Sequence, residues 1–315
     1  MTSRRLIRIK VLQILYSYIK KENVSQAETE RDLLKSIEKS TDLYYEMLLL
    51  LLEIQRKAFL KIDSAKNKHF TTEADLHPNT RFIENPIFSI IQSNKKFKNY
   101  LLNHPISWNE NPETVYVLYN TILESQAYQL YMSKAEVNFE THKQLILDIF
   151  ADIISQNELL FQILEDKNIF WNDDYELVFG LVYKTLKNLK AGYTEDDSIF
   201  HPIYNEKEDI DFAKTLLRKT ILGHEENIKT IDKFTYNWEI DRISDTDKLI
   251  MSEAIAELKN FPSIPVKVTL DEYIEISKNY SSPKSSAFIN GVLDKVVSLF
   301  KDSGEIVKTG RGLME

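Results

Sequence analysis

The 315-residue chain is predicted to be all-α, and three observations support this prediction. Its 7 glycines and 8 prolines fall well below the usual shares of about 7% and 5%, so few residues favour tight turns. Apolar residues recur at intervals of three and four along most of the chain, which is the period of an amphipathic helix. X-Pro pairs separate these periodic stretches, and helices are expected to end before them.

The first predicted helix spans about residues 3–21 and has a basic N-terminal end. Arg4, Arg5 and Arg8 lie in its first turns, and no acidic residue occurs up to Lys21. The helix dipole disfavours each such cation by about 0.3–1 kcal/mol, so a ligand would explain them better than helix stability. Arginine grips phosphate and exposed aromatic rings stack on bases, which makes RNA a candidate. On composition alone, a solvated helix tip is the preferred alternative. The apolar stripe of this helix comprises Val11, Leu12, Leu15, Tyr16 and Ile19.

The middle of the chain is predicted to be a series of helices. Their approximate ranges are residues 25–66, 86–103, 112–136, 142–164, 174–189 and 209–234. The polar, acidic segment 192–204 is the best candidate for a domain boundary. Two segments of this region are weakly similar: Trp108-Asn109 and Trp171-Asn172 are each followed by acids and then an apolar run. A duplicated helical hairpin or chance similarity would explain this.

The final third is predicted to contain three helices. The first begins near Asp245 and ends near Phe261-Pro262. Thr269 and Glu272 have the spacing of a capping box, in which the threonine caps the helix and the glutamate reaches back. The last helix begins at Ser285-Ser286, and the tail from about residue 303 is expected to fray.

The residue inventory argues against catalysis. The chain has no cysteine, which excludes disulfides, zinc–thiolate sites and cysteine nucleophiles and fits a cytoplasmic protein. Its 6 histidines include no pair at zinc-binding helical spacing, and its glycines form no phosphate-binding loop. The apolar run 48–52 is far shorter than a membrane span. We therefore expect no enzyme activity, no cofactor, no metal and no membrane association. A mitochondrial transit peptide is the open alternative for the basic N-terminus.

Two segments together resemble the NusB family. Residues 3–16, SRRLIRIKVLQILY, resemble its Arg-rich opening helix, which runs into Gln-x-Leu-Tyr. The stretch from Asp241 onward resembles its C-terminal half through Glu257-Leu258, Ile264-Pro265 and Glu272. It ends on residues 288–294, FINGVLD, which is the more specific match.

The resemblance implies two small helical bundles and an RNA-binding adaptor in transcription antitermination. It further implies pairing with NusE, a small-subunit ribosomal protein, on boxA-type leader RNA of ribosomal RNA operons, within the RNA polymerase antitermination complex. The implied RNA contacts are Arg4, Arg5, Arg8, Lys10, Phe288, Asn290 and Gly291. Tyr16 and Asp247 match positions near the NusE contact. Packing of the last helix remains the alternative for Phe288 and Gly291.

The chain is about twice as long as typical family members, and the resemblance covers only residues 1–22 and about 206–315. We expect the first helix of an N-terminal bundle at 1–22, an inserted helical region at 23–205 and the rest of that bundle at 206–240. The C-terminal bundle is expected at 241–302 and the tail at 303–315. Three roles for the insert remain open: it could cover the RNA face, replace a partner or mediate self-association as a homo-oligomer.

Two other functions stay in competition with the first. A helical protein-interaction module that lost RNA binding would suit the net charge of −8, although the acid-free first helix opposes it. A ribosome-assembly adaptor would use the same RNA chemistry. The NusB-like domain of RNA cytosine methyltransferases is excluded, because this chain lacks the catalytic cysteine.

Overall fold

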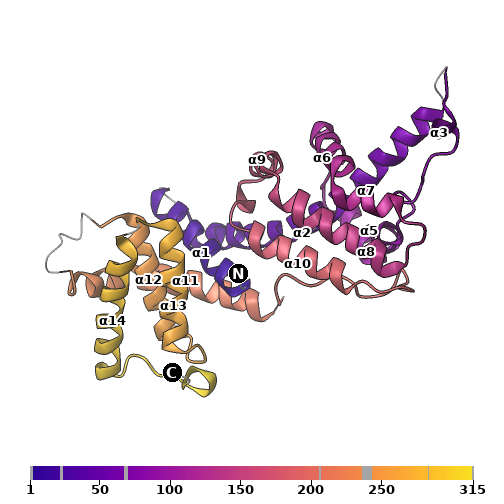
Figure 1. Cartoon of the computed structure of the whole chain (residues 1–315). Helices are drawn as coiled ribbons and strands as arrows, with labels where there is room; N and C mark the ends of the chain where they lie inside the picture. Colours follow the sequence, from indigo (N-terminus) through magenta and orange to yellow (C-terminus); the bar gives the residue numbers. More distant parts are fainter. Residues whose placement is uncertain are drawn as a thin grey trace. The chain divides into compact units, whose positions relative to one another are not determined.

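The computed structural model describes residues 3–21, 24–66, 70–205, 207–235, 243–282 and 284–313. Within these ranges the chain forms helices and no strand, which confirms the all-α prediction (Figure 1). The expected boundaries at residues 22 and 23, at 206, and at 240 and 241, with Asp241 itself, lie outside the described residues.

The chain divides into two compact units: Met1–Ile37 with Tyr204–Glu315, and Glu38–Ile203. The first unit contains α1 (Ser3–Lys20) and the start of α2 (Gln26–Lys66). It also contains α11 (Glu208–Asp232), α12 (Asp245–Asn260), α13 (Val266–Tyr280), α14 (Ser285–Ser303) and the 3-10 turn Gly310–Leu313. All nine residues predicted to bind RNA or a partner belong to this unit.

The second unit consists of the remainder of α2 and shorter helices. These are α3 (Glu73–Leu76), α4 (Pro86–Ser93), α5 (Lys95–Asn103), α6 (Pro112–Glu124), α7 (Gln126–Ser133), α8 (Phe139–Asp148), α9 (Glu158–Lys167) and α10 (Tyr175–Asn188). A π turn (Ile149–Ile153) and a 3-10 turn (Ile154–Gln156) follow α8, and another 3-10 turn (Ile169–Trp171) follows α9.

Three predicted helices of the second unit are each broken by a side-chain cap. Asn94 separates α4 from α5, and its side chain accepts a hydrogen bond from the Lys96 amide at 3.0 Å. Ser125 separates α6 from α7, and its hydroxyl accepts a hydrogen bond from the Tyr128 amide at 3.2 Å. Asn157 opens α9, and its side chain accepts from the Leu160 amide at 2.8 Å. Serine and asparagine compete with the helix for backbone groups, so apolar periodicity alone misses such breaks.

Helix α1 packs against α11, α12 and α13 in the core of the first unit. From Leu6 to Leu12 every residue is buried, whichever side of the helix it lies on. A helix surrounded by neighbours buries its whole circumference rather than one stripe. Tyr16 is instead 43% exposed, although it belongs to the predicted apolar stripe.

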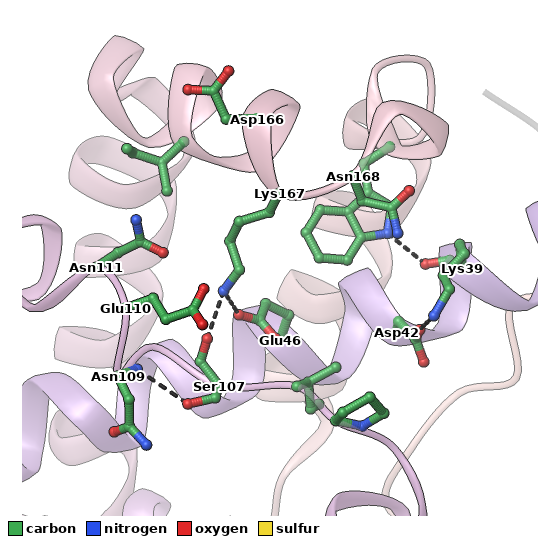
Figure 2. Close-up of a pocket in the computed structure, with 14 residues that line it drawn as sticks. Lys39, Asp42, Glu46, Ser107, Asn109, Glu110, Asn111, Asp166, Lys167 and Asn168 are labelled. Carbon is green, nitrogen blue, oxygen red and sulfur yellow. Dashed lines mark hydrogen bonds and ion pairs between the residues drawn. The ribbon is translucent and has the colours of Figure 1, made fainter.

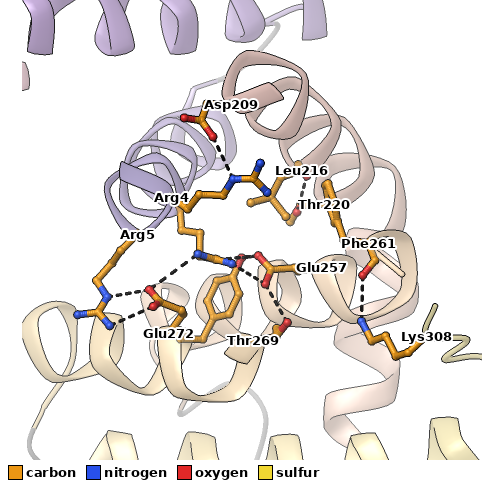
Figure 3. Close-up of polar contacts among 12 residues, drawn as sticks. Arg4, Arg5, Asp209, Leu216, Thr220, Glu257, Phe261, Thr269, Glu272 and Lys308 are labelled. Atoms are coloured by element: carbon orange, nitrogen blue, oxygen red, sulfur yellow. Dashed lines mark hydrogen bonds and ion pairs between the residues drawn. The ribbon is translucent and has the colours of Figure 1, made fainter. Parts of the chain in front are cut away.

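The predicted capping box at Thr269 is wrong. Helix α13 begins earlier, at Val266, with Pro265 at its N-cap, so Thr269 lies inside the helix. Its hydroxyl donates to Glu257 Oε1 at 2.8 Å, and Glu272 accepts from Arg5 (Figure 3). The side chains of Thr269 and Glu272 therefore bond with residues of other helices and do not cap α13.

The tail expected to fray is tied to the C-terminal end of α12 in the described residues. Gly304 ends α14 in the left-handed conformation, with φ 73°. The Lys308 ammonium then donates to the carbonyl oxygens of Leu258 and Phe261, each at 3.1 Å, and Figure 3 shows the bond to Phe261. A cation at the negative end of a helix satisfies carbonyl groups that the helix leaves unpaired. Near the end of the tail, a Cβ on Gly312 would lie 1.9 Å from the Pro262 carbonyl oxygen, so only glycine fits there.

Candidate nucleic-acid interface

The basic end of α1 faces carboxylates on three other helices. Arg4 Nε donates to Asp209 on α11 at 3.0 Å, and Arg5 Nε donates to Glu272 on α13 at 2.7 Å (Figure 3). Arg8 bonds with both oxygens of Glu257 on α12, at 2.7 and 2.8 Å. The three arginines, disfavoured by the helix dipole, therefore have tertiary counter-charges.

Arg8 and Lys10 lie in the interior of the first unit. The Arg8 side chain is 3% exposed, and its guanidinium lies near the rings of Phe212 and Tyr273, at 5.3 and 5.9 Å. Lys10 is 1% exposed. The expectation that these two residues contact RNA is therefore corrected, because a phosphate cannot reach side chains enclosed by protein.

Arg4 and Arg5 keep part of their surface in solvent. Their side chains are 37% and 28% exposed, and Arg4 also lies over the Phe212 ring at 4.8 Å. Such partly exposed ion pairs contribute little stability, so a phosphate can compete for the guanidinium groups. Of the basic residues of α1, Arg4 and Arg5 remain the candidates for contacts with the RNA phosphate backbone.

A buried carboxyl group lies close to the arginine network. Glu253 on α12 is fully buried, and neither of its oxygens has a hydrogen-bond partner among the residues that the structure describes. Burial raises the pKa of Glu253 well above 4.5, and the nearby charge of Glu257 raises it further. We therefore expect Glu253 to be protonated well above that pH.

The second candidate segment lies on α14, where Phe288 is half-buried, Asn290 is partly exposed and Gly291 is exposed. A Cβ added to Gly291 would meet nothing within 4 Å. The position therefore does not need glycine for packing, and glycine inside a helix costs about 0.5–1 kcal/mol relative to alanine. Close approach of a ligand would account for it. The Asn290 side chain donates to Asp294 at 3.4 Å.

Phe288 and Asp247 line one pocket of about 450 Å³ in the first unit. Ser244 and Asp247 come from the start of α12, whereas Lys284 and Phe288 come from α14 and the residue before it. The Ser281 hydroxyl donates to the Asp247 carboxylate, which ties α12 to the C-cap of α13. The structure thus brings together two residues for which the sequence implied different partners.

Tyr16 lies on the last turns of α1, away from the arginine network. The Lys20 ammonium lies over its ring at 5.6 Å and also pairs with Asp245 at 2.6 Å. An exposed tyrosine beside a cation suits a protein interface, because tyrosine is enriched in such surfaces. Among the described residues, Tyr16 is not part of the pocket that Phe288 and Asp247 line.

Sequence reasoning missed the carboxylates that face the arginines. Glu253 and Glu257 lie four residues apart within an apolar stretch of α12, and both are fully buried. Acids at this spacing within an apolar helix face were a detectable signal for a buried charge network. The described residues contain no group of three or more metal-ligating side chains and no helix that could cross a membrane.

Comparison with known proteins finds the NusB family, whose model matches residues 158–298. The transcription antitermination protein NusB of Salinibacter ruber is 42% identical over 113 residues, covering 36% of this chain and 71% of that protein. Proteins of the same name from Chloroherpeton thalassium and Natranaerobius thermophilus are 42% and 37% identical, over 51% and 70% of their lengths and 33% and 29% of this chain. No solved structure matches the chain.

The matched stretch includes Asp247, Phe288, Asn290 and Gly291. It begins at residue 158, inside the second unit, whereas the expected insertion extended to residue 205. The first helix, with its arginines, lies outside this stretch.

Proposed function

The chain belongs to the NusB family, since it covers 71% of a 42% identical relative, and on this premise we propose that it is an RNA-binding transcription antitermination factor. The relatives are named transcription antitermination proteins. We further propose that the RNA is boxA-type leader RNA of ribosomal RNA operons, and that the factor acts without catalysis in the RNA polymerase antitermination complex.

The exposed surface of α14 is the observation that carries this proposal. Gly291 leaves open space on the helix, and Phe288 offers part of an aromatic ring beside the 450 Å³ pocket. Unpaired RNA bases stack on aromatic side chains, and a helix surface without a Cβ lets a nucleotide come close. Arg4 and Arg5 would add contacts to the phosphate backbone.

NusE is the proposed protein partner, with Tyr16 and Asp247 near the contact. Tyr16 is 43% exposed and therefore available, whereas Asp247 is 6% exposed and bonded to Ser281. We assign Asp247 the role of shaping the contact by holding the ends of α12 and α13 together.

Residues 38–157, the part of the second unit that precedes the family match, are proposed to be an insertion into the family fold. Residues up to Ile37 and from Tyr204 onward form one compact unit, so the chain leaves that unit and returns to it. Replacing residues 38–157 by a short linker should then preserve RNA binding. Loss of RNA binding with helicity retained would contradict the proposal.

The test is fluorescence anisotropy with a labelled boxA-like leader RNA and a scrambled RNA, with and without NusE, across a salt series. We expect preference for the boxA-like RNA and tighter binding with NusE. On single-stranded RNA, each neutralised phosphate should contribute about 0.7 to the slope of log affinity against log salt. Absence of RNA binding at low salt would overturn the proposal.

A second candidate function is a protein-interaction module without RNA binding. The pairing of Arg4, Arg5 and Arg8 with internal carboxylates favours it, because these charges are already neutralised within the protein. NusE binding that is unaffected by RNA would identify this function. A role in ribosome assembly would use the same RNA and NusE contacts.

A further inference from the structure

Two Trp-Asn turns of the second unit bind to the same helix. The Trp108 indole donates to the Glu46 carbonyl oxygen at 3.1 Å. The Trp171 indole donates to the Lys39 carbonyl oxygen at 2.7 Å, a bond that Figure 2 shows. These carbonyl groups on α2 are seven residues, or about two helical turns, apart. The repeated sequence element thus has a repeated structural role.

A cavity of about 680 Å³ lies where these turns meet α2, which is the size of a small-molecule site. Small-molecule sites are usually lined mainly by apolar side chains, but this cavity is lined mostly by charged and amide groups. Its charged side chains are Lys39, Asp42, Glu46, Glu110, Asp166 and Lys167. Four carboxylates against two ammonium groups leave a formal excess of two negative charges.

Both ammonium groups of this cavity are already paired, and the Lys39 ammonium bonds with Asp42. The Lys167 ammonium bonds with Glu46 and donates to the Ser107 carbonyl oxygen at 2.6 Å (Figure 2). It also lies 4.3 Å from the centre of the Trp108 ring, which adds a cation–π contact. A carboxylate, a carbonyl and an aromatic face together make a binding site for an ammonium group.

The cavity has further carboxylate oxygens besides those that bond with the Lys167 ammonium. Glu46 is fully buried, and its Oε2 has no hydrogen-bond partner in the part of the chain that is described. Glu110 points toward Lys167 and Glu46 in Figure 2, and Asp166 stands at the rim pointing away from them. Neither Glu110 nor Asp166 pairs with a cation among the described residues.

We propose that this cavity binds a further ammonium group, carried on an aliphatic chain, between Glu110 and the buried Glu46 carboxylate, with Asp166 at the rim. Such a group is presented either by a free polyamine or by a lysine side chain of another polypeptide. Burial raises the pKa of Glu46 despite the charge of Lys167, which is consistent with a carboxylate that lacks full compensation.

The probes are spermidine and 1,5-diaminopentane, titrated into the full chain by calorimetry, with the fully N-acetylated diamine as control. We expect saturable one-to-one binding of the amines, weaker binding at higher salt, and none of the acetylated compound. Glu110→Gln and Asp166→Asn should each weaken binding roughly three-fold, and the double variant about ten-fold. Glu124→Gln, an exposed acid of the same unit outside the cavity, is the matched control and should change nothing.

A short lysine-containing peptide and its acetyl-lysine version separate the two sources. Binding of the lysine peptide without binding of the free amines assigns the site to a polypeptide partner, and the converse assigns it to a small molecule. The proposal is overturned if neither kind of probe binds, if the acetylated probes bind equally well, or if Glu124→Gln weakens binding as much as Glu110→Gln. RNA affinity, measured separately on the same variants, should stay unchanged, so this result and the test of RNA binding are independent.

Discussion

Arg8 on α1 and Glu257 on α12 form a two-point ion pair inside the first unit. Their side chains are 3% and 0% exposed, and the two nitrogen–oxygen distances are 2.7 and 2.8 Å. Thr269 donates to the same carboxylate at 2.8 Å. The pair holds the first helix to a helix that lies more than two hundred residues later in the chain, so Arg8 belongs to the framework of the site.

Removing Arg8 should destabilise the fold strongly. Arg8→Met leaves Glu257 buried without its counter-charge, and we expect a loss of about 3–5 kcal/mol in the free energy of unfolding. Arg5→Met, at a partly exposed pair, should cost at most about 1 kcal/mol. Urea unfolding followed by circular dichroism measures both. Equal losses for the two variants would refute a special role of the buried pair, and adding Glu257→Met to Arg8→Met should restore much of the stability.

The double variant Arg4→Gln with Arg5→Gln should weaken binding to every RNA. If both arginines contact phosphates, the slope of log affinity against log salt should flatten by about 1.4, or 0.7 for each contact. Anisotropy titrations at several salt concentrations test this result. An unchanged slope would mean that Arg4 and Arg5 stay paired with Asp209 and Glu272 and do not contact phosphates.

Replacing Gly291 should move stability and RNA affinity in opposite directions. Gly291→Ala should raise the free energy of unfolding by about 0.5–1 kcal/mol, because alanine is the better helix former and its Cβ has space. The same methyl group should weaken RNA binding if a nucleotide touches the helix there. Unfolding curves and anisotropy on one preparation give both quantities. Unchanged RNA affinity would remove Gly291 from the interface.

Phe288→Ala should reduce the preference for boxA-like RNA over scrambled RNA. Base–aromatic stacking contributes about 1–3 kcal/mol per base, so we expect a loss of at least about five-fold in affinity for the cognate RNA. Circular dichroism must first show that the fold is intact, since the ring also lines the pocket beside Asp247. Equal losses on both RNAs would argue against base reading by Phe288.

Glu253→Gln should make stability less dependent on pH. The pKa of Glu253 is raised in the folded protein, so protonated Glu253 stabilises the fold fully below about pH 4.5, and this contribution is lost as pH rises toward the raised pKa. The glutamine side chain cannot ionise, so the free energy of unfolding of the variant should exceed that of the wild type by more at pH 8 than at pH 5. Urea unfolding at the two pH values measures the difference. Parallel stability profiles for both proteins would contradict it.

From the sequence alone, the helical class and several helix ends followed from local rules. Asn85-Pro86 starts α4, Pro112 starts α6 and α12 begins at Asp245, as predicted, because prolines and polar caps act on the few residues next to them. The family resemblance likewise came from local patterns, and the match over residues 158–298 supports its C-terminal part.

Tertiary structure decided which predicted site residues face solvent. Arg8 and Lys10 are buried and Tyr16 is exposed, contrary to their polarity, because α1 lies among three helices from the far end of the chain. Helical periodicity reports only neighbours three and four residues away, whereas Arg8 is paired by Glu257 and Arg5 by Glu272. Burial of a charge depends on a partner that is distant in sequence, so only the folded chain determines which arginines remain available to RNA.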